Sequence, residues 1–122
     1  MGLRHTTVKS FKYAFQGLHT ALKNEPNFRV HIVIAILTLT AGCLLGLTSI
    51  EWLFLTFTIF YVLTFELLNT VLEAMVDLVS PEITPSAKIA KDVSAACVLL
   101  GAFMAIVVGV TLFLPKIILL FK

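Results

Sequence analysis

Three long apolar runs dominate the chain, and each is long enough to cross a membrane as a helix. They cover residues 29–47, 52–79 and 92–114, and inside the first run the polar breaks are His31 and a few threonines. Because a helix rises about 1.5 Å per residue, about 20 apolar residues cross the hydrocarbon core of a bilayer. The pattern predicts an all-α integral membrane protein with three transmembrane helices, organised as one domain over residues 1–122.

A different period marks the N-terminal segment, residues 7–24. Apolar side chains recur there at steps of three and four residues, namely Val8, Phe11, Phe15, Leu18 and Leu22. Basic and polar side chains lie away from this stripe, namely Lys9, Lys12, Gln16, His19 and Lys23. Such an amphipathic helix can lie flat on an anionic membrane surface, and the alternative is a helix packed on other protein. Pro26 then suits the first turn of the next helix.

The composition agrees with a membrane protein. Of the 122 residues, 59% are hydrophobic and 13% are charged, whereas a soluble domain has about a quarter of charged residues. This balance excludes a soluble globular protein, a disordered tail and a nucleic-acid binder.

The basic residues are unevenly distributed between the predicted connections. Five, Arg4 among them, fall in the first 29 residues, and two, Lys88 and Lys91, lie between the second and third runs. The connection between the first and second runs contains none. The positive-inside rule therefore predicts a cytoplasmic N-terminus and an external C-terminus, with Trp52 as an aromatic anchor at the outer interface.

Two weaker patterns concern packing. Cys43 and Cys97 each sit inside an apolar run without a CxxC partner, so we expect small buried residues rather than a metal site or a disulfide. Small residues four apart, at Gly42-x-x-x-Gly46 and along 101–109, allow helices to approach closely inside lipid and make oligomerisation plausible.

The second run carries a stripe of polar residues. Glu66, Asn69, Glu73 and Asp77 stand at positions i, i+3, i+7 and i+11, which places them within an arc of about 80° on one helix face. A charge at membrane depth costs at least a few kcal/mol, so such carboxylates indicate function. Asp77 could equally pair with a lysine for packing. No basic residue in any run is expected at the depth of Glu66, which favours a chemical role there.

Other charged residues are predicted to lie near this stripe. Glu25 precedes the first run and Lys91-Asp92 precedes the third, at the cytoplasmic level of Glu73. Carboxylates that hold Mg²⁺ and a lysine that holds phosphate recur in phosphoryl transfer, and Glu66 could take a proton from a lipid alcohol. Nucleotide signatures of soluble kinases are missing. The rival interpretation is a small oligomeric proton-coupled transporter in which Glu66 titrates.

The stripe also carries a family resemblance. The segment Glu66-Leu-Leu-Asn69-Thr-Val-Leu-Glu73-Ala-Met-Val-Asp77 resembles the E-x-x-N-[ST]-x-x-E-x-x-x-D signature of the prokaryotic diacylglycerol kinase family. Ala90-Lys91-Asp92, with the small residues that follow it, resembles the second motif of that family. The similarity extends from about Val8 to Leu114. Within it, the sequence Arg29-Val-His31 looks more like the undecaprenol kinase branch of the family.

This resemblance implies an activity and an assembly. The activity would be MgATP-dependent phosphorylation of the hydroxyl of a membrane lipid alcohol, with undecaprenol as the favoured acceptor and diacylglycerol as the alternative. The cofactors would be ATP and Mg²⁺. The assembly would be a homotrimer with active sites shared between protomers, in the bacterial cytoplasmic (inner) membrane.

The resemblance also implies roles for single residues. Glu66 would be the catalytic base and would contact the substrate. Glu25 and Glu73 would bind the metal ions that accompany ATP, and Asn69 and Ala95 would contact the substrate. The other ATP contacts would come from Tyr13, Glu82, Lys91 and Asp92.

The remaining polar residues fit these patterns less closely. The spacing of His5, His19 and His31 matches no metal-ligand motif, although His31 could contact a lipid head group. The chain departs from the family pattern at Thr6, where some members have arginine. It departs again at Ile83-Thr84, where a Tyr-His pair often follows the acidic residue of the loop.

Overall fold

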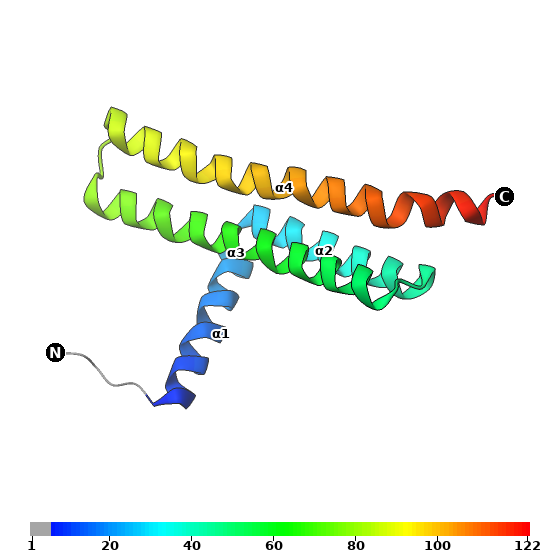
Figure 1. Cartoon of the computed structure of the whole chain (residues 1–122). Coiled ribbons are helices and arrows are strands. Elements are labelled where there is room, and N and C mark those ends of the chain that lie inside the picture. The colour runs from blue at the N-terminus through cyan, green and yellow to red at the C-terminus, as the bar shows by residue number, and fades with distance from the viewer. Residues whose placement is uncertain (1–5) are drawn as a thin grey trace.

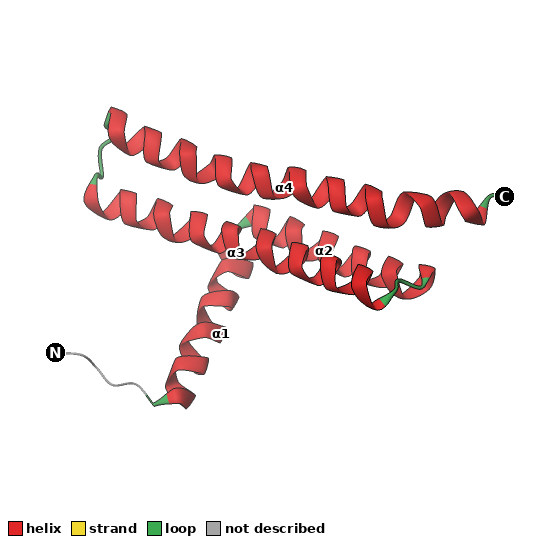
Figure 2. Ribbon diagram, in the orientation of Figure 1, coloured by secondary structure: helices red, strands yellow, loops and turns green. Residues whose placement is uncertain are grey.

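The computed structural model describes residues 6–122, so Arg4 and His5 lie outside the described residues. Its helices are α1 (Thr7–Asn24), α2 (Pro26–Leu45), α3 (Ser49–Val79) and α4 (Pro85–Leu120). Helices α2, α3 and α4 run side by side, whereas α1 leaves this bundle at a steep angle (Figure 1). Short loops connect the helices (Figure 2). Since α2, α3 and α4 are long and apolar enough to cross a membrane, the predicted all-α membrane fold is confirmed.

The junction between α1 and α2 is held by Arg29. Its Nη1 atom donates hydrogen bonds to the carbonyl oxygens of Leu22 and Lys23, at 3.1 and 2.9 Å. These carbonyls belong to the last turn of α1, where no intrahelical donor remains for them. Pro26 stands in the first turn of α2, as its sequence position predicted. The junction therefore fixes the direction in which α1 leaves the bundle.

The turn between α2 and α3 is built from local caps. Gly46 ends α2 with φ of 70°, a left-handed conformation that glycine adopts without steric cost. Thr48 and Glu51 then form a capping box at the start of α3. The helix therefore begins at Ser49, about one turn before the expected start at residue 52.

Helix α4 is longer than its apolar run at both ends. The run was predicted over 92–114, but the helix spans Pro85–Leu120 and takes in Lys88 and Lys91 at one end and Lys116 at the other. Thr84 caps its start by accepting a hydrogen bond from the backbone N–H of Ala87, at 3.2 Å. At the start, the cap rather than hydropathy sets the end of the helix, so the extension there falls in a polar flank. At the other end the helix continues past Pro115 and Lys116 through the apolar residues 117–120.

Much of the apolar packing lies near the turn between α2 and α3. Leu47, Leu55 and Leu112 form a buried cluster there. Gly42 lies against Trp52, since a Cβ atom on this glycine would approach the indole Cη2 to 2.9 Å. This small residue therefore serves contacts inside one chain.

The cysteines follow the faces of their helices. Cys97 is half-buried, but Cys43 is exposed, so the expected burial of Cys43 is wrong for the single chain. It follows Gly42 by one residue, and about 100° of helical rotation turns it away from the face that packs on Trp52.

Candidate active site

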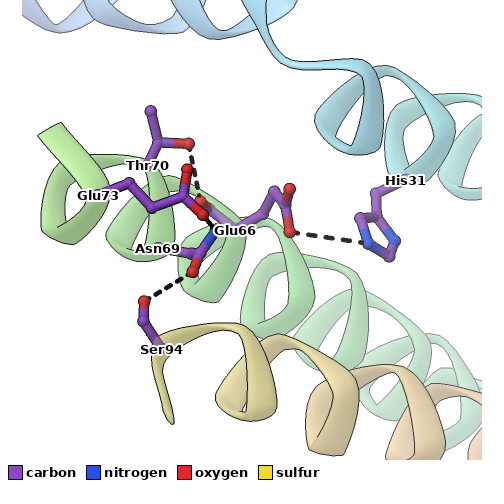
Figure 3. A network of polar contacts seen from close by, with 6 residues as sticks. All are labelled: His31, Glu66, Asn69, Thr70, Glu73 and Ser94. Carbon is purple, nitrogen blue, oxygen red and sulfur yellow. Dashed lines mark hydrogen bonds and ion pairs between the residues drawn. The ribbon is translucent and has the colours of Figure 1, made fainter. Parts of the chain in front are cut away.

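The polar stripe of α3 forms the centre of the candidate site (Figure 3). Glu66 is only 2% exposed, although it is an acidic residue in the middle of an apolar helix. One turn further along, the Asn69 amide nitrogen donates a hydrogen bond to Glu73 Oε1 at 3.1 Å. Thr70 donates its hydroxyl to the backbone carbonyl of Glu66 at 3.1 Å. The helical spacing therefore brings these side chains to one face, as predicted.

Helix α4 adds a residue that the sequence had not singled out. The Ser94 hydroxyl donates to the Asn69 amide oxygen at 2.6 Å. Because Asn69 also donates to Glu73, both ends of its amide are engaged and its orientation is defined. The signal in the sequence was a serine within an apolar run, and the structure shows that this serine is buried.

Helix α2 contributes His31, which points towards Glu66 (Figure 3). Its Nε2 atom lies 4.0 Å from Glu66 Oε2. The expectation that no basic residue lies at the depth of Glu66 is therefore wrong. The first turns of α2 lie beside the middle of α3. Helix α3 continues well past the start of α2, towards its connection with α4 (Figure 1).

One oxygen of Glu66 has unused hydrogen-bonding capacity. Oε2 is buried and receives no hydrogen bond from the described residues, and 4.0 Å to His31 is too long for one. Leaving a buried acceptor without a donor costs free energy, typically about 1–3 kcal/mol. A donor that enters the site, such as an alcohol, would recover this cost.

Two further carboxylates lie near Glu66. Glu25, at the junction of α1 and α2, and Glu73 are both close enough to interact electrostatically with it, as is His31. Within residues 6–122, no three side chains of His, Cys, Asp or Glu form a group that could hold a metal ion. Mg²⁺ does not require three ligands from the protein, because it commonly binds one or two carboxylates together with water and substrate phosphates. The carboxylates of Glu25 and Glu73 are therefore of the kind that could hold this ion beside a bound nucleotide.

The basic side of the site comes from the start of α4. Lys91 Nζ lies 2.5 Å from Asp77 Oδ1 on α3, and the Lys91 ammonium also interacts electrostatically with Glu73. Asp77 thus pairs with a lysine, as one of its two interpretations expected. Asp92 forms an ion pair with Lys88, one turn earlier on the same exposed face.

The other predicted site residues lie further out. Glu82 is in the connection between α3 and α4, where its backbone carbonyl accepts a hydrogen bond from the Ser80 hydroxyl at 2.6 Å. Tyr13 lies half-exposed on α1, and Ala95 is exposed on α4. The group around Glu66 is thus formed by α2, α3, α4 and the α1–α2 junction.

Comparison with known proteins agrees with this arrangement. The family model described as prokaryotic diacylglycerol kinase matches residues 12–113. An undecaprenol kinase of Bacillus subtilis (strain 168) is 38% identical over 109 residues, which are 89% of each chain. A diacylglycerol kinase of Synechocystis sp. (strain ATCC 27184 / PCC 6803 / Kazusa) is 43% identical over 88% of this chain and 62% of its own. A diacylglycerol kinase of Haemophilus influenzae (strain ATCC 51907 / DSM 11121 / KW20 / Rd) is 35% identical over 92% of this chain and 95% of its own.

The match covers α2 and α3 completely and most of α1 and α4, and it includes the whole polar stripe of α3. Identities of 31–43% over most of the chain support the same conclusion. The chain therefore belongs to the prokaryotic diacylglycerol kinase family and is a membrane lipid kinase, a phosphotransferase with an alcohol acceptor.

Proposed function

We propose that this kinase transfers the γ-phosphate of ATP to the hydroxyl of undecaprenol, with Mg²⁺ as the metal. The observation that carries the proposal is Glu66, a buried carboxylate whose Oε2 receives no hydrogen bond from the described residues. A lipid alcohol can bring a hydroxyl to this depth, whereas a water-soluble alcohol cannot. A general base must lie within hydrogen-bond reach of the proton that it removes, and Oε2 can take that position.

On the acceptor side, Glu66 would take the hydroxyl proton as the oxygen attacks phosphorus. His31, whose Nε2 atom lies 4.0 Å from Glu66 Oε2, would orient the carboxylate. Asn69, held by Ser94 and bonded to Glu73, would contact the acceptor or the transferred phosphate. The proton moves to Glu66, the new bond joins the alcohol oxygen to phosphorus, and ADP leaves.

On the donor side, Lys91 would bind phosphate oxygens, since its ammonium lies exposed enough to exchange Asp77 for a phosphate. Glu25 and Glu73 would hold Mg²⁺ through their carboxylates. When bound, this ion neutralises charge on the phosphates. Tyr13, Glu82 and Asp92 would supply the remaining nucleotide contacts, and Ala95 would contact the acceptor.

We further propose a homotrimer in the bacterial inner membrane with sites shared between protomers. In the single chain α1 leaves the bundle and its apolar stripe is exposed. The buried residue of this helix is Ala21, which lies near its junction with α2. That stripe suits the membrane surface, and its lysines suit anionic head groups on the cytoplasmic side. The N-terminus would then be cytoplasmic and the C-terminus external. Exposed Ala95 leaves room for a neighbouring protomer to complete the site.

Relatives of both acceptor classes match most of this chain. The Bacillus subtilis protein named undecaprenol kinase, 38% identical over 89% of both chains, supports undecaprenol, as does the resemblance of the Arg29-Val-His31 stretch to that branch. Diacylglycerol is the second candidate because the Synechocystis and Haemophilus influenzae proteins named diacylglycerol kinase are 43% and 35% identical. Neither the family nor these names support a proton-coupled transporter.

The test is a side-by-side transfer assay. The purified protein is placed in bilayers that contain undecaprenol and diacylglycerol at equal mole fraction, and γ-labelled ATP and Mg²⁺ are added. We expect labelled undecaprenyl phosphate to form faster than labelled phosphatidic acid. Faster labelling of diacylglycerol would contradict the acceptor, and labelling of neither lipid would contradict the whole proposal.

A further inference from the structure

A cleft lies between the three membrane helices directly beside the candidate site. Its volume is about 80 Å³, and its walls come from α2, α3 and α4. The residues that matter for its shape and position are His31, Ala35, Thr38, Thr58, Ala105 and Gly109. His31 belongs both to the wall of this cleft and to the contact with Glu66.

Small residues keep the cleft open. Ala35 and Ala105 line it from α2 and α4, and a Cβ atom built on Gly109 would meet no atom within 4 Å. Thr38 and Thr58 also line the cleft, but each hydroxyl already donates a hydrogen bond to a backbone carbonyl of its own helix, at 3.0 and 2.7 Å. The walls therefore offer mainly hydrocarbon to a ligand, which suits an apolar chain and offers few partners to water.

The cleft is also directed along the membrane helices. On α3 it extends from Leu63, one turn from Glu66, to Leu55, which corresponds to about 12 Å along the helix axis. It thus leads from the His31–Glu66 contact towards the turn between α2 and α3. A lipid that places its polar end at Glu66 would place the next part of its chain in this cleft.

We infer that the cleft holds the hydrocarbon segment next to the hydroxyl of the lipid acceptor. The inference rests on the proposed function, because it assigns the acceptor to a position next to Glu66. Hydrogen-bonding capacity distinguishes this occupant from a bulk phospholipid. The phosphodiester of a phospholipid is ionised and has no proton to donate to Glu66 Oε2, whereas a neutral alcohol donates a hydrogen bond to it.

The first test does not depend on turnover. The wild-type protein in bilayers is irradiated with a prenol that carries a diazirine near its hydroxyl end, and the labelled residues are mapped by mass spectrometry. We expect labels on residues that line the cleft, such as Thr38, Thr58 and Gly109, and reduced labelling when unlabelled prenol is added. Labels confined to the outer faces of the bundle, or equal labelling of the cleft by a diazirine phospholipid, would overturn the inference.

The second test fills the cleft. Thr38→Leu adds bulk inside it, and Thr40→Leu is the matched control, because Thr40 is exposed on the same helix and its hydroxyl also bonds a carbonyl of that helix. Gly109→Leu fills the opposite wall. We expect both filling variants to raise the KM for the alcohol about tenfold and leave the KM for ATP unchanged, as a pocket that misfits by a few methylene groups does.

These tests separate the two proposals. If the filling variants match Thr40→Leu in their KM for the alcohol, the cleft is not the acceptor subsite, even though transfer occurs. If the prenol labels the cleft but no phosphate is transferred, the cleft assignment stands and the proposed function fails. Labelling of wild-type protein keeps the inference testable if a filling variant does not fold.

Discussion

Two carboxylates on α3 show how differently the two ends of the bundle use charge. Glu51, in the first turn, accepts a hydrogen bond from the backbone N–H of Thr48 at 2.8 Å and lies 3.0 Å from Lys116 Nζ. Glu66, in the middle of the same helix, is more deeply buried, yet its Oε2 receives no hydrogen bond from the described residues. The first carboxylate is satisfied by its own chain and the second is not.

This difference separates a structural role from a chemical one. At the turn between α2 and α3, the capping box and the Glu51–Lys116 pair join the start of α3 to the end of α4. At the other end, charged groups lie close to one another and keep capacity for ligands, as Glu66 and Lys91 do. Changes at the first end should therefore affect stability, and changes at the second end should affect transfer.

On the nucleotide side of the site, the largest effect should come from removing the metal. Chelation of divalent cations should lower transfer at least about a hundredfold, since the ion supplies several kcal/mol of charge stabilisation, and added Mg²⁺ should restore it. Glu73→Gln should raise the Mg²⁺ concentration needed for half-maximal transfer, because it removes a carboxylate charge. Transfer that persists in chelator would contradict the assignment of Glu25 and Glu73 as metal ligands.

A smaller effect is expected at Lys91. Lys91→Met should lower kcat/KM for ATP about tenfold, because a charge-assisted hydrogen bond is worth about 1.5–3 kcal/mol. Asp77→Asn is the matched control, since it weakens the same ion pair but keeps the ammonium. Equal losses in the two variants would show that the ion pair, rather than a phosphate contact, is what matters.

A still smaller effect should follow from Ser94→Ala. This variant removes the hydrogen bond that orients Asn69, and a lost bond of about 1 kcal/mol corresponds to about a fivefold lower kcat. The KM for ATP should not change, because Ser94 is not among the residues proposed to contact the nucleotide. A kcat equal to that of Ser86→Ala, an exposed serine on the same helix, would argue against the positioning role.

The smallest effect on transfer is expected at the other end of the bundle. Glu51→Gln should leave kcat within about twofold of wild type, as substitutions away from a site usually do. It should lower the unfolding temperature in detergent, because the cap and the ion pair with Lys116 are both weakened. The comparison between the two ends fails if this variant loses transfer while its unfolding temperature stays unchanged.

Much of this arrangement could be predicted because it follows from one helix at a time. Hydropathy predicts the three membrane helices, and a period of 3.6 residues places Glu66, Asn69 and Glu73 on one face. A proline, Pro26, predicts the start of α2. Each of these signals lies within about 20 residues of chain and needs no knowledge of how helices pack.

What could not be predicted depends on packing between helices. His31 reaches Glu66 only because α2 begins beside the middle of α3, and Ser94 reaches Asn69 only because α4 returns along α3. Cys43 is exposed because its neighbour Gly42 takes the packed face. Helix α4 extends into its N-terminal polar flank because the Thr84 cap, rather than hydropathy, sets its start.

The central claim is that Glu66 is the base that activates a lipid hydroxyl, and a single-turnover transfer measurement tests it most directly. Wild-type protein and Glu66→Gln are compared in bilayers that contain undecaprenol, with saturating γ-labelled ATP and Mg²⁺. We expect Glu66→Gln to fold and bind ATP like wild type but to transfer phosphate about 10²–10⁴-fold more slowly, the usual contribution of a general base. A Glu66→Gln protein that transfers phosphate at the wild-type rate would contradict the claim.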